Sequence, residues 1–404
     1  MRRMMRQLAK GVGVFGLMVV AMVAFAGTAF AANPPIGLIP GEDPGTPAAP
    51  AEPKITKRVR VAEGLNVPAN TYKFTLTREI IEDSETNEMS PIVNNPIEIN
   101  MSASAPGTVK DADGYVYKEA TSDNVLKDIT FPHAGIYSYL VREGTGSNPI
   151  NEGTMTYSSE SYRMRVYVDN EPSTSNVYVK YVTFHLVTRV NGITTETKAD
   201  PVFTNTYTKK TTFEIKKMVA GDYADKKKDF TYTLTLSKVP GVSGNQSYIA
   251  QYYLANGTKG RQGQFTVDRP VTFTLKHGES IVFEDNIEVG TKYKLEENPY
   301  ANYKAEVVVS NADGEIGTEV GADKNTAVTI GDPIASNTNL QAPILLTEKS
   351  ASATNKAEWT NTYAEPPTPT GIFLNNLPFI LMIVIAISGF TGYIVMKRRS
   401  RRTE

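Results

Sequence analysis

The stretch ITKRV at residues 55–59 recurs as IKKMV at residues 215–219, and FTNTY at residues 203–207 recurs as WTNTY at residues 359–363. Each lysine-bearing stretch precedes a segment rich in aromatic residues and threonine, and each asparagine-bearing stretch follows at a similar separation in the two copies. Markers that repeat in the same order at similar separations indicate an internal repeat. The middle of the chain therefore divides into two copies of one unit, with the boundary between Tyr207 and Thr212.

Within each copy, apolar and polar residues alternate with period two, which is typical of half-buried β-strands. The alternation is seen in residues 72–77, 162–168, 177–187, 230–236 and 271–275. Clusters of Gly, Pro, Asn and Asp separate these short runs, and no long amphipathic helix stands out before the C-terminal region. We therefore predict an all-β fold with two tandem β-sandwich domains, at residues 54–208 and 209–363.

The N-terminus has the layout of a secretory signal peptide, with basic residues, an apolar run and an Ala29-x-Ala31 pattern. We predict a signal peptide at residues 1–31, cleaved between Ala31 and Ala32. A permanent membrane helix is less favoured, because the apolar run is short and is broken by three glycines. Seven prolines between residues 33 and 53 then predict an extended stalk over residues 32–53.

The C-terminal segment, residues 364–404, combines a short motif, an apolar span and a basic tail. Residues 377–396 are long enough to cross about 30 Å of hydrocarbon, and the cations of the tail, residues 397–404, should stay in the cytoplasm. The preceding motif is Thr368-Pro369-Thr370-Gly371. A plain single-pass anchor is one interpretation. A sortase sorting signal, cut between Thr370 and Gly371, accounts for all three features and is favoured. The segment resembles the sorting signals of Gram-positive surface proteins, although the motif lacks the leucine and the spacer residue of the common Leu-Pro-x-Thr-Gly form.

Composition excludes several function classes. The formal net charge is -1, but nine basic residues lie at the two ends, and without them and Glu404 the middle has a net charge of -9. Such a surface argues against a nucleic-acid partner. The chain has no cysteine, and its three histidines lie far apart without metal-ligand spacing. We expect no metal site, no cofactor and, with no GxSxG motif or paired-carboxylate motif, no secreted hydrolase.

A lysine, a glutamate and an asparagine recur in register in the two copies. Between the lysine and the asparagine, YLVRE at residues 139–143 recurs as YKLEE at residues 293–297. The two sets are Lys57, Glu143 and Asn205 in the first copy, and Lys217, Glu297 and Asn361 in the second. The lysine shares a strand face with apolar residues, so it should point inward. First and last strands are commonly neighbours in a sandwich, so each set could meet in the interior.

Burial would change the chemistry of these groups. An ammonium among apolar neighbours loses its proton more readily, so the pKa of the lysine falls from about 10.4 and the amine becomes nucleophilic. A buried glutamic acid stays protonated and could donate a hydrogen bond to the asparagine amide oxygen. The amine could then attack the amide carbon, with the glutamate carrying protons and ammonia leaving, to give an isopeptide bond. Solvated lysines and surface ion pairs are the alternative, but the set occurs twice.

These residues, together with the signals at both ends and FTLKHGES at residues 273–280, resemble the FctA-type backbone pilins of Gram-positive bacteria. The resemblance implies two Ig-like (CnaB-like) sandwiches, each tied by an autocatalytic Lys–Asn bond that the glutamate assists, in a structural protein rather than an enzyme. It also implies a lysine shortly before Asn205 that receives Thr370 of the next subunit. Lys198 occupies that place, with Lys209 and Lys210 as alternatives.

The resemblance implies a cell-surface pilus attached to the Gram-positive cell wall, with the precursor held in the membrane by its C-terminal helix. The expected partners are a pilin-class sortase and identical subunits joined head to tail, with tip or base pilins and host surface ligands as further candidates. The main alternative is a monomeric, sortase-anchored adhesin, which would share the signals and the sandwiches but not the polymer.

Overall fold

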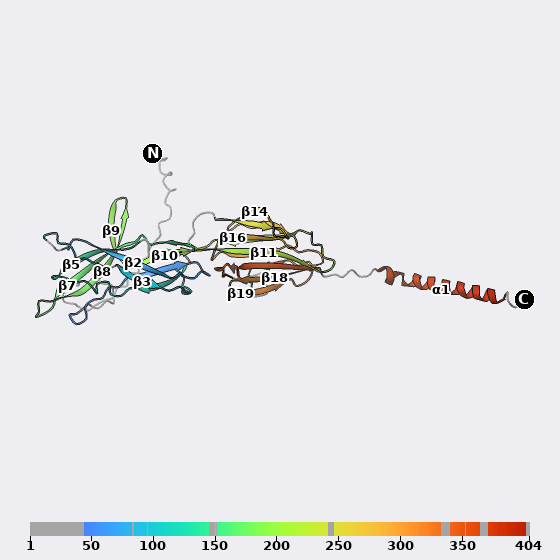
Figure 1. The fold of residues 1–404 in the computed structure, drawn as a ribbon, viewed down its shortest axis with the longest axis horizontal. Helices are drawn as coiled ribbons and strands as arrows, with labels where there is room; N and C mark the ends of the chain where they lie inside the picture. Colours follow the sequence, from blue (N-terminus) through green and yellow to red (C-terminus); the bar gives the residue numbers. More distant parts are fainter. Residues whose placement is uncertain are drawn as a thin grey trace, which may run out of the picture. The chain divides into compact units, whose positions relative to one another are not determined.

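The computed structural model describes residues 44–82, 85–94, 96–144, 150, 152–240, 246–332, 340–351, 353–363 and 371–400 (Figure 1). The predicted signal peptide, its cleavage site at Ala31 and Ala32, and the sorting residues Thr368, Pro369 and Thr370 lie outside the described residues.

Two sheets enclose the first hydrophobic core, one ordered β4-β1-β10-β6 and the other β3-β2-β5-β7-β8-β9. Their strands are β1 (Thr56–Val61), β2 (Asn70–Arg78), β3 (Ile97–Met101), β4 (Val116–Thr121), β5 (Gly135–Glu143), β6 (Thr154–Thr156), β7 (Ser161–Asn170), β8 (Val177–Val190), β9 (Ile193–Lys198) and β10 (Val202–Thr208). All the pairings are antiparallel except that of β1 with β10, which is parallel. We call this unit the first sandwich.

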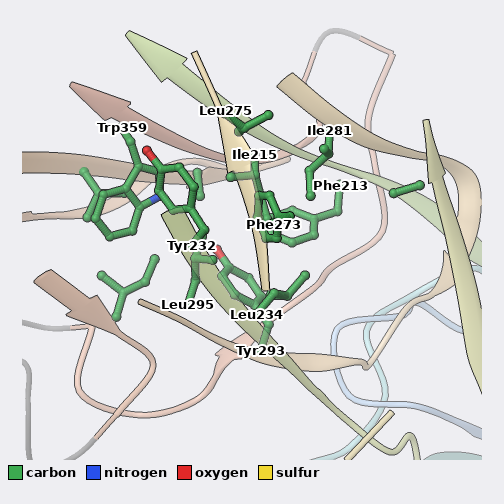
Figure 2. Packing of buried hydrophobic residues seen from close by; sticks show 14 of the residues in the cluster. Phe213, Ile215, Tyr232, Leu234, Phe273, Leu275, Ile281, Tyr293, Leu295 and Trp359 are labelled. Carbon is green, nitrogen blue, oxygen red and sulfur yellow. The ribbon is translucent and has the colours of Figure 1, made fainter. Parts of the chain in front are cut away.

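The second sandwich has sheets ordered β14-β13-β16-β11-β22-β18-β19 and β15-β12-β17-β20, with β21 paired to β17. Its strands are β11 (Lys210–Ala220), β12 (Phe230–Ser237), β13 (Ser247–Tyr253), β14 (Lys259–Thr266), β15 (Val271–Leu275), β16 (Ser280–Glu288), β17 (Lys292–Glu297), β18 (Tyr303–Asn311), β19 (Gly314–Val320), β20 (Val328–Ile330), β21 (Ile344–Leu345) and β22 (Asn355–Tyr363). Aromatic side chains from both sheets fill its core, with Trp359 beside Tyr232 (Figure 2).

Period-two alternation explains why these segments form strands around a core. Buried and half-buried residues alternate along β1, β10, β12 and β22, so each strand turns one face to the interior. The predicted all-β fold is confirmed, and the strands inferred from alternation are all present. None of the described residues before Gly371 is helical.

The parallel pairing of the first and last strands is the feature that positions the candidate site. In the first sandwich Val59 lies opposite Asn205, so Lys57 is two residues away from that position on the same buried face. In the second sandwich Val219 lies opposite Asn361, which gives Lys217 the same offset. The two sandwiches therefore place their lysine and asparagine as diagonal neighbours in the same register.

Part of the predicted stalk is not an extended spacer. Gly45 N donates to Lys180 O and Ala51 N donates to Val179 O, so this segment pairs with the backbone of β8. The prolines in this segment do not prevent pairing. The N–H groups of Gly45 and Ala51, which lie between prolines, remain available to the edge of β8 that β9 leaves unpaired. Residues 32–43 lie outside the described residues.

The helix α1 (Gly371–Ser400) is the single helix among the described residues (Figure 1). Its stretch Pro378–Arg399 is long and apolar enough to cross a membrane by length and composition, and none of that stretch is buried against the rest of the protein. Lys397, Arg398 and Arg399 lie in its last turn. This arrangement fits the membrane anchor predicted for residues 377–396.

Candidate functional site

Lys57, Glu143 and Asn205 meet in the interior of the first sandwich, and we call them the first cluster. Lys57 Nζ lies 3.0 Å from Glu143 Oε2 and 3.1 Å from the carbonyl oxygen of Phe203. Asn205 Nδ2 donates to Glu143 Oε1 at 2.8 Å. The lysine and the asparagine come from neighbouring strands of one sheet, and the glutamate comes from the end of β5 in the facing sheet. One carboxylate therefore holds both the amine and the amide.

Lys217, Glu297 and Asn361 form the second cluster in the same way. Lys217 Nζ lies 2.9 Å from Glu297 Oε1 and 2.5 Å from Asn361 Oδ1. The glutamate is again the last residue of a strand, β17, in the sheet that faces the lysine and the asparagine. The two sets predicted from the repeated sequence markers are thus both brought together by the fold.

Both lysines are fully buried, which changes their acidity. The side chains of Lys57 and Glu143 are each 0% exposed, as is that of Lys217. Burial lowers the pKa of Lys57 to about 8, although the Glu143 carboxylate opposes the shift. Burial likewise lowers the pKa of Lys217 to about 8, opposed by Glu297. A buried ammonium is costly, so the neutral amine, which is the nucleophilic form, is more accessible than in a solvated lysine.

The pKa of the carboxyl in the second cluster, Glu297, is shifted in the opposite direction. Burial raises the pKa of Glu297, and the contacts with Lys217, Tyr232 and Asn361 offset this rise only in part. The pKa values of Lys217 and Glu297 are thus brought closer together, and a proton can pass between the two groups at low cost in free energy. This is the condition for a proton shuttle between an attacking amine and a leaving group.

Aromatic rings enclose both amines. Lys57 Nζ lies 4.9 Å from the centre of the Tyr72 ring, and Lys217 Nζ lies 4.1 Å from the centre of the Phe230 ring. The two positions correspond, since Tyr72 and Phe230 each stand two residues before the residue opposite the glutamate. These rings exclude water, which strengthens the electrostatic interactions inside each cluster.

The residue opposite the glutamate differs between the sandwiches. It is Phe74 opposite Glu143 and Tyr232 opposite Glu297. Tyr232 donates its hydroxyl proton to Glu297 Oε1 at 2.8 Å, whereas Phe74 has no hydroxyl to donate. Sequence reasoning missed Tyr232 as a member of the site, although its place in the repeated aromatic strand was a usable signal.

The expected direction of one hydrogen bond is wrong. From the sequence, the glutamic acid is expected to donate to the asparagine amide oxygen, whereas Glu143 accepts from the amide nitrogen of Asn205. The physical reason is that the oxygen, Asn205 Oδ1, is already held by the backbone N–H of Ser158 at 2.8 Å. Sequence reasoning did not find Ser158, because it reaches the cluster from a segment without a repeated marker.

The three candidate linking lysines lie in different surroundings. Lys198 is the last residue of β9, half-buried and opposite His185 on β8. Lys209 is 14% exposed and forms ion pairs with Glu152 and Glu348. Burial acts to lower the pKa of Lys209, but the hydrogen bonds to both carboxylates outweigh it and raise this pKa. Lys210, which begins β11, is exposed.

Among the described residues, no group of three or more His, Asp or Glu side chains could hold a metal ion.

Comparison with protein-family models matches two segments of the chain. Residues 53–208 match the model of the FctA family, the Spy0128-like isopeptide containing domain, and residues 211–332 match a domain of unknown function, DUF7601. The first sandwich is therefore similar to the Spy0128-like isopeptide containing domain. The resemblance to FctA-type backbone pilins expected from the sequence is confirmed by this match. Asn205, Glu143 and Lys57 all lie inside the matched segment.

Among solved structures, the major pilin from Streptococcus pyogenes is 22% identical, with 78% of this chain and 98% of that chain covered and a TM-score of 0.32. The T3.2 major pilin of the same organism is 21% identical over 77% of this chain and 98% of that chain, with a TM-score of 0.31. The pilus-presented adhesin Spy0125 (Cpa) is 16% identical over 49% of this chain and 38% of that chain, with a TM-score of 0.24. No curated protein gave a significant match to the chain.

Proposed function

We propose that this protein is a structural subunit of a covalent, sortase-assembled cell-surface pilus, and that each sandwich ties itself together through a Lys–Asn isopeptide bond. The observation that carries the proposal is the pair of buried Lys–Glu–Asn clusters. In both, the lysine and the asparagine lie on neighbouring parallel strands in the same register, and the glutamate comes from the facing sheet. The match of residues 53–208 to an isopeptide containing domain supports the same chemistry.

In each cluster the neutral lysine nitrogen attacks the amide carbon of the asparagine. The glutamate accepts protons from the attacking nitrogen and delivers one to the leaving nitrogen, so that ammonia departs. The two oxygens of Glu143 suit this task, because one contacts Lys57 and the other contacts the amide nitrogen of Asn205. The reaction occurs once per site, so the protein modifies itself and is not a turnover enzyme.

Assembly would use the signals at the two ends of the chain. The helix α1 and its basic end hold the precursor in the membrane, where a pilin-class sortase cuts between Thr370 and Gly371. The Thr370 carboxyl is then transferred to a lysine of the next subunit, and we assign this role to Lys198. The strong ion pairs of Lys209 keep that amine charged and engaged, which makes it a poor acceptor.

The intramolecular bonds are tested by the intact mass of recombinant residues 32–370. We expect a mass lower than the sequence mass by two ammonias, because each closed site loses one. Glu143→Ala or Glu297→Ala should reduce this mass deficit to one ammonia, since each variant removes the proton carrier of one site only. A wild-type protein at the full sequence mass would refute the isopeptide chemistry.

A further inference from the structure

We propose that the backbone N–H of Ser158 is the oxyanion donor of the first cluster. In this role it stabilises the negative charge that develops on Asn205 Oδ1 while Lys57 attacks the amide carbon. The inference rests on the proposed isopeptide chemistry and adds a group that touches the reacting carbonyl but belongs to neither the lysine, the glutamate nor the asparagine.

The contact places a donor on the atom that becomes the oxyanion. Ser158 N lies 2.8 Å from Asn205 Oδ1 before the attack. An oxyanion donor needs a distance of about 2.7 to 3.1 Å to the position that this oxygen takes in the transition state. A backbone N–H can only donate, so the amide atom that faces it must be the oxygen. The other end of the same amide donates to Glu143 Oε1 at 2.8 Å. The oxygen and the nitrogen of the Asn205 amide are therefore both identified by their partners, and the carbonyl is polarised before the attack.

The segment that carries Ser158 is held in place on both sides. Before it, β6 pairs with β10, where Thr156 lies opposite Thr206, next to Asn205. After it, the Ser158 hydroxyl accepts from Glu160 N at 3.3 Å and donates to Glu160 Oε2 at 3.2 Å. A donor that is fixed before the reaction needs no reorganisation during it, which is the basis of electrostatic catalysis in a water-excluded site.

The chemical step balances with this donor in place. A bond forms between Lys57 Nζ and Asn205 Cγ, and the carbonyl electron pair moves onto Oδ1, where the Ser158 N–H holds it. The pair then returns and the Cγ–Nδ2 bond breaks. Starting from the ammonium and the carboxylate, the Lys57 nitrogen gives two protons in turn to Glu143. Glu143 passes one of them to Nδ2, which leaves as ammonia, and the carboxyl ends neutral.

The second cluster provides a control within the same chain. There the amide oxygen of Asn361 accepts from Lys217 Nζ at 2.5 Å. Ser158 belongs to the first sandwich and donates to Asn205. A change at Ser158 should therefore slow the first bond and leave the second bond untouched.

The decisive variants are Ser158→Pro, which deletes the N–H, and Ser158→Ala, which keeps it. The full chain is made by cell-free translation in mild detergent and stopped at intervals in acid. After proteolysis, the ratio of cross-linked to linear peptides gives the rate of each bond separately. We expect Ser158→Pro to slow the Lys57–Asn205 bond about 100-fold or more, as deletion of one oxyanion donor does elsewhere. Ser158→Ala should stay within a few-fold of wild type.

An unchanged rate of the first bond in Ser158→Pro would overturn the proposal. Because proline could disturb the local backbone, an ester in place of the amide at residue 158 serves as a second variant that removes only the N–H. A wild-type rate in the ester would also overturn the proposal, and slowing in the ester supports it. Absence of both cross-linked peptides in the wild type would instead refute the isopeptide chemistry, so the two failures are distinguishable.

Discussion

Lys57 and Lys217 are unusual residues, because a fully buried ammonium would cost the fold several kcal/mol unless it is paired or loses its proton. Each has a carboxylate within 3.0 Å, so the pair can share a single proton. The reactive form, a neutral amine beside a carboxylic acid, has the same number of protons as the ion pair. The balance between these two forms should therefore govern the rate of bond formation.

This balance predicts the pH dependence of the reaction. Raising the pH through about 8 removes the last proton from each pair, because that is the pKa of Lys57 and of Lys217. Lowering the pH through the raised pKa of Glu297 adds a second proton and charges the amine. We expect a bell-shaped rate for the second bond, with its alkaline limb near pH 8. Refolding of unreacted protein at different pH values, followed by intact mass, measures this profile.

Tyr232→Phe provides the matched variant for this profile, since phenylalanine is the residue that the first sandwich has at the equivalent position, Phe74. The Tyr232 hydroxyl stabilises the charged form of Glu297, so its loss should raise the pKa of Glu297 further. The acid limb of the second bond should move to higher pH, while the first bond keeps its profile. An acid limb that stays in place would contradict the assigned role of Glu297.

Among the structural elements, the parallel pairs β1–β10 and β11–β22 matter most. Each joins the first and last strands of a sandwich, so a covalent bond between them closes nearly the whole domain into one loop. Simple chain-entropy estimates give about 4 to 5 kcal/mol for a cross-link that spans a loop of about 150 residues. Unlike a disulfide, the proposed isopeptide link would not be reducible, which suits a chain without cysteine.

Loss of the link should lower the thermal stability of one sandwich. For Asn205→Ala we expect the Tm of the first sandwich to fall by on the order of 10 to 20 °C, from the lost loop constraint. Calorimetry of the variant beside Asn361→Ala, which should affect the second sandwich instead, measures the effect. An unchanged Tm in both variants would show that the cross-links do not stabilise the fold.

The unlinked first sandwich should also respond to pH in a defined direction. The pKa of Lys57 is lower in the folded state than in the unfolded state, so the unfolded chain binds more protons between about pH 8 and pH 10.5. Stability therefore rises with pH across this window, as the penalty for burying the charged amine disappears. The same titration of the linked wild type should lack this rise, because an amide nitrogen does not titrate there.

For the whole molecule, the central question is whether subunits are joined to one another. In a host with a pilin-class sortase, we expect high-molecular-weight ladders that survive boiling in detergent and disappear in Lys198→Ala. Lys210→Ala, which removes an exposed lysine at the start of β11, is the control and should keep the ladders. A single wall-attached band in the wild type would favour the monomeric adhesin instead, and loss of ladders only in Lys210→Ala would move the linking role to that residue.

The elements themselves were largely predictable from sequence. Alternation along residues 72–77 and 230–236 predicts strands because one face of each must be buried, and the repeat markers identify Lys57, Glu143 and Asn205 by position alone. The pairing of Gly45 and Ala51 with β8 was not predictable, because it depends on which strand edge the proline-rich segment meets. Composition alone could not distinguish such a segment from a free stalk.

The two-copy organisation, the all-β fold, the C-terminal apolar helix and the residue types of both clusters follow from the order of residues alone, because periodicity and repetition can be read along the chain. Which atoms meet within each cluster depends on the tertiary structure. Ser158 N on Asn205 Oδ1 and the Tyr232 hydroxyl on Glu297 are contacts between residues 47 and 65 positions apart. Strand register and the approach of two sheets set such contacts, and no local pattern in the chain encodes them.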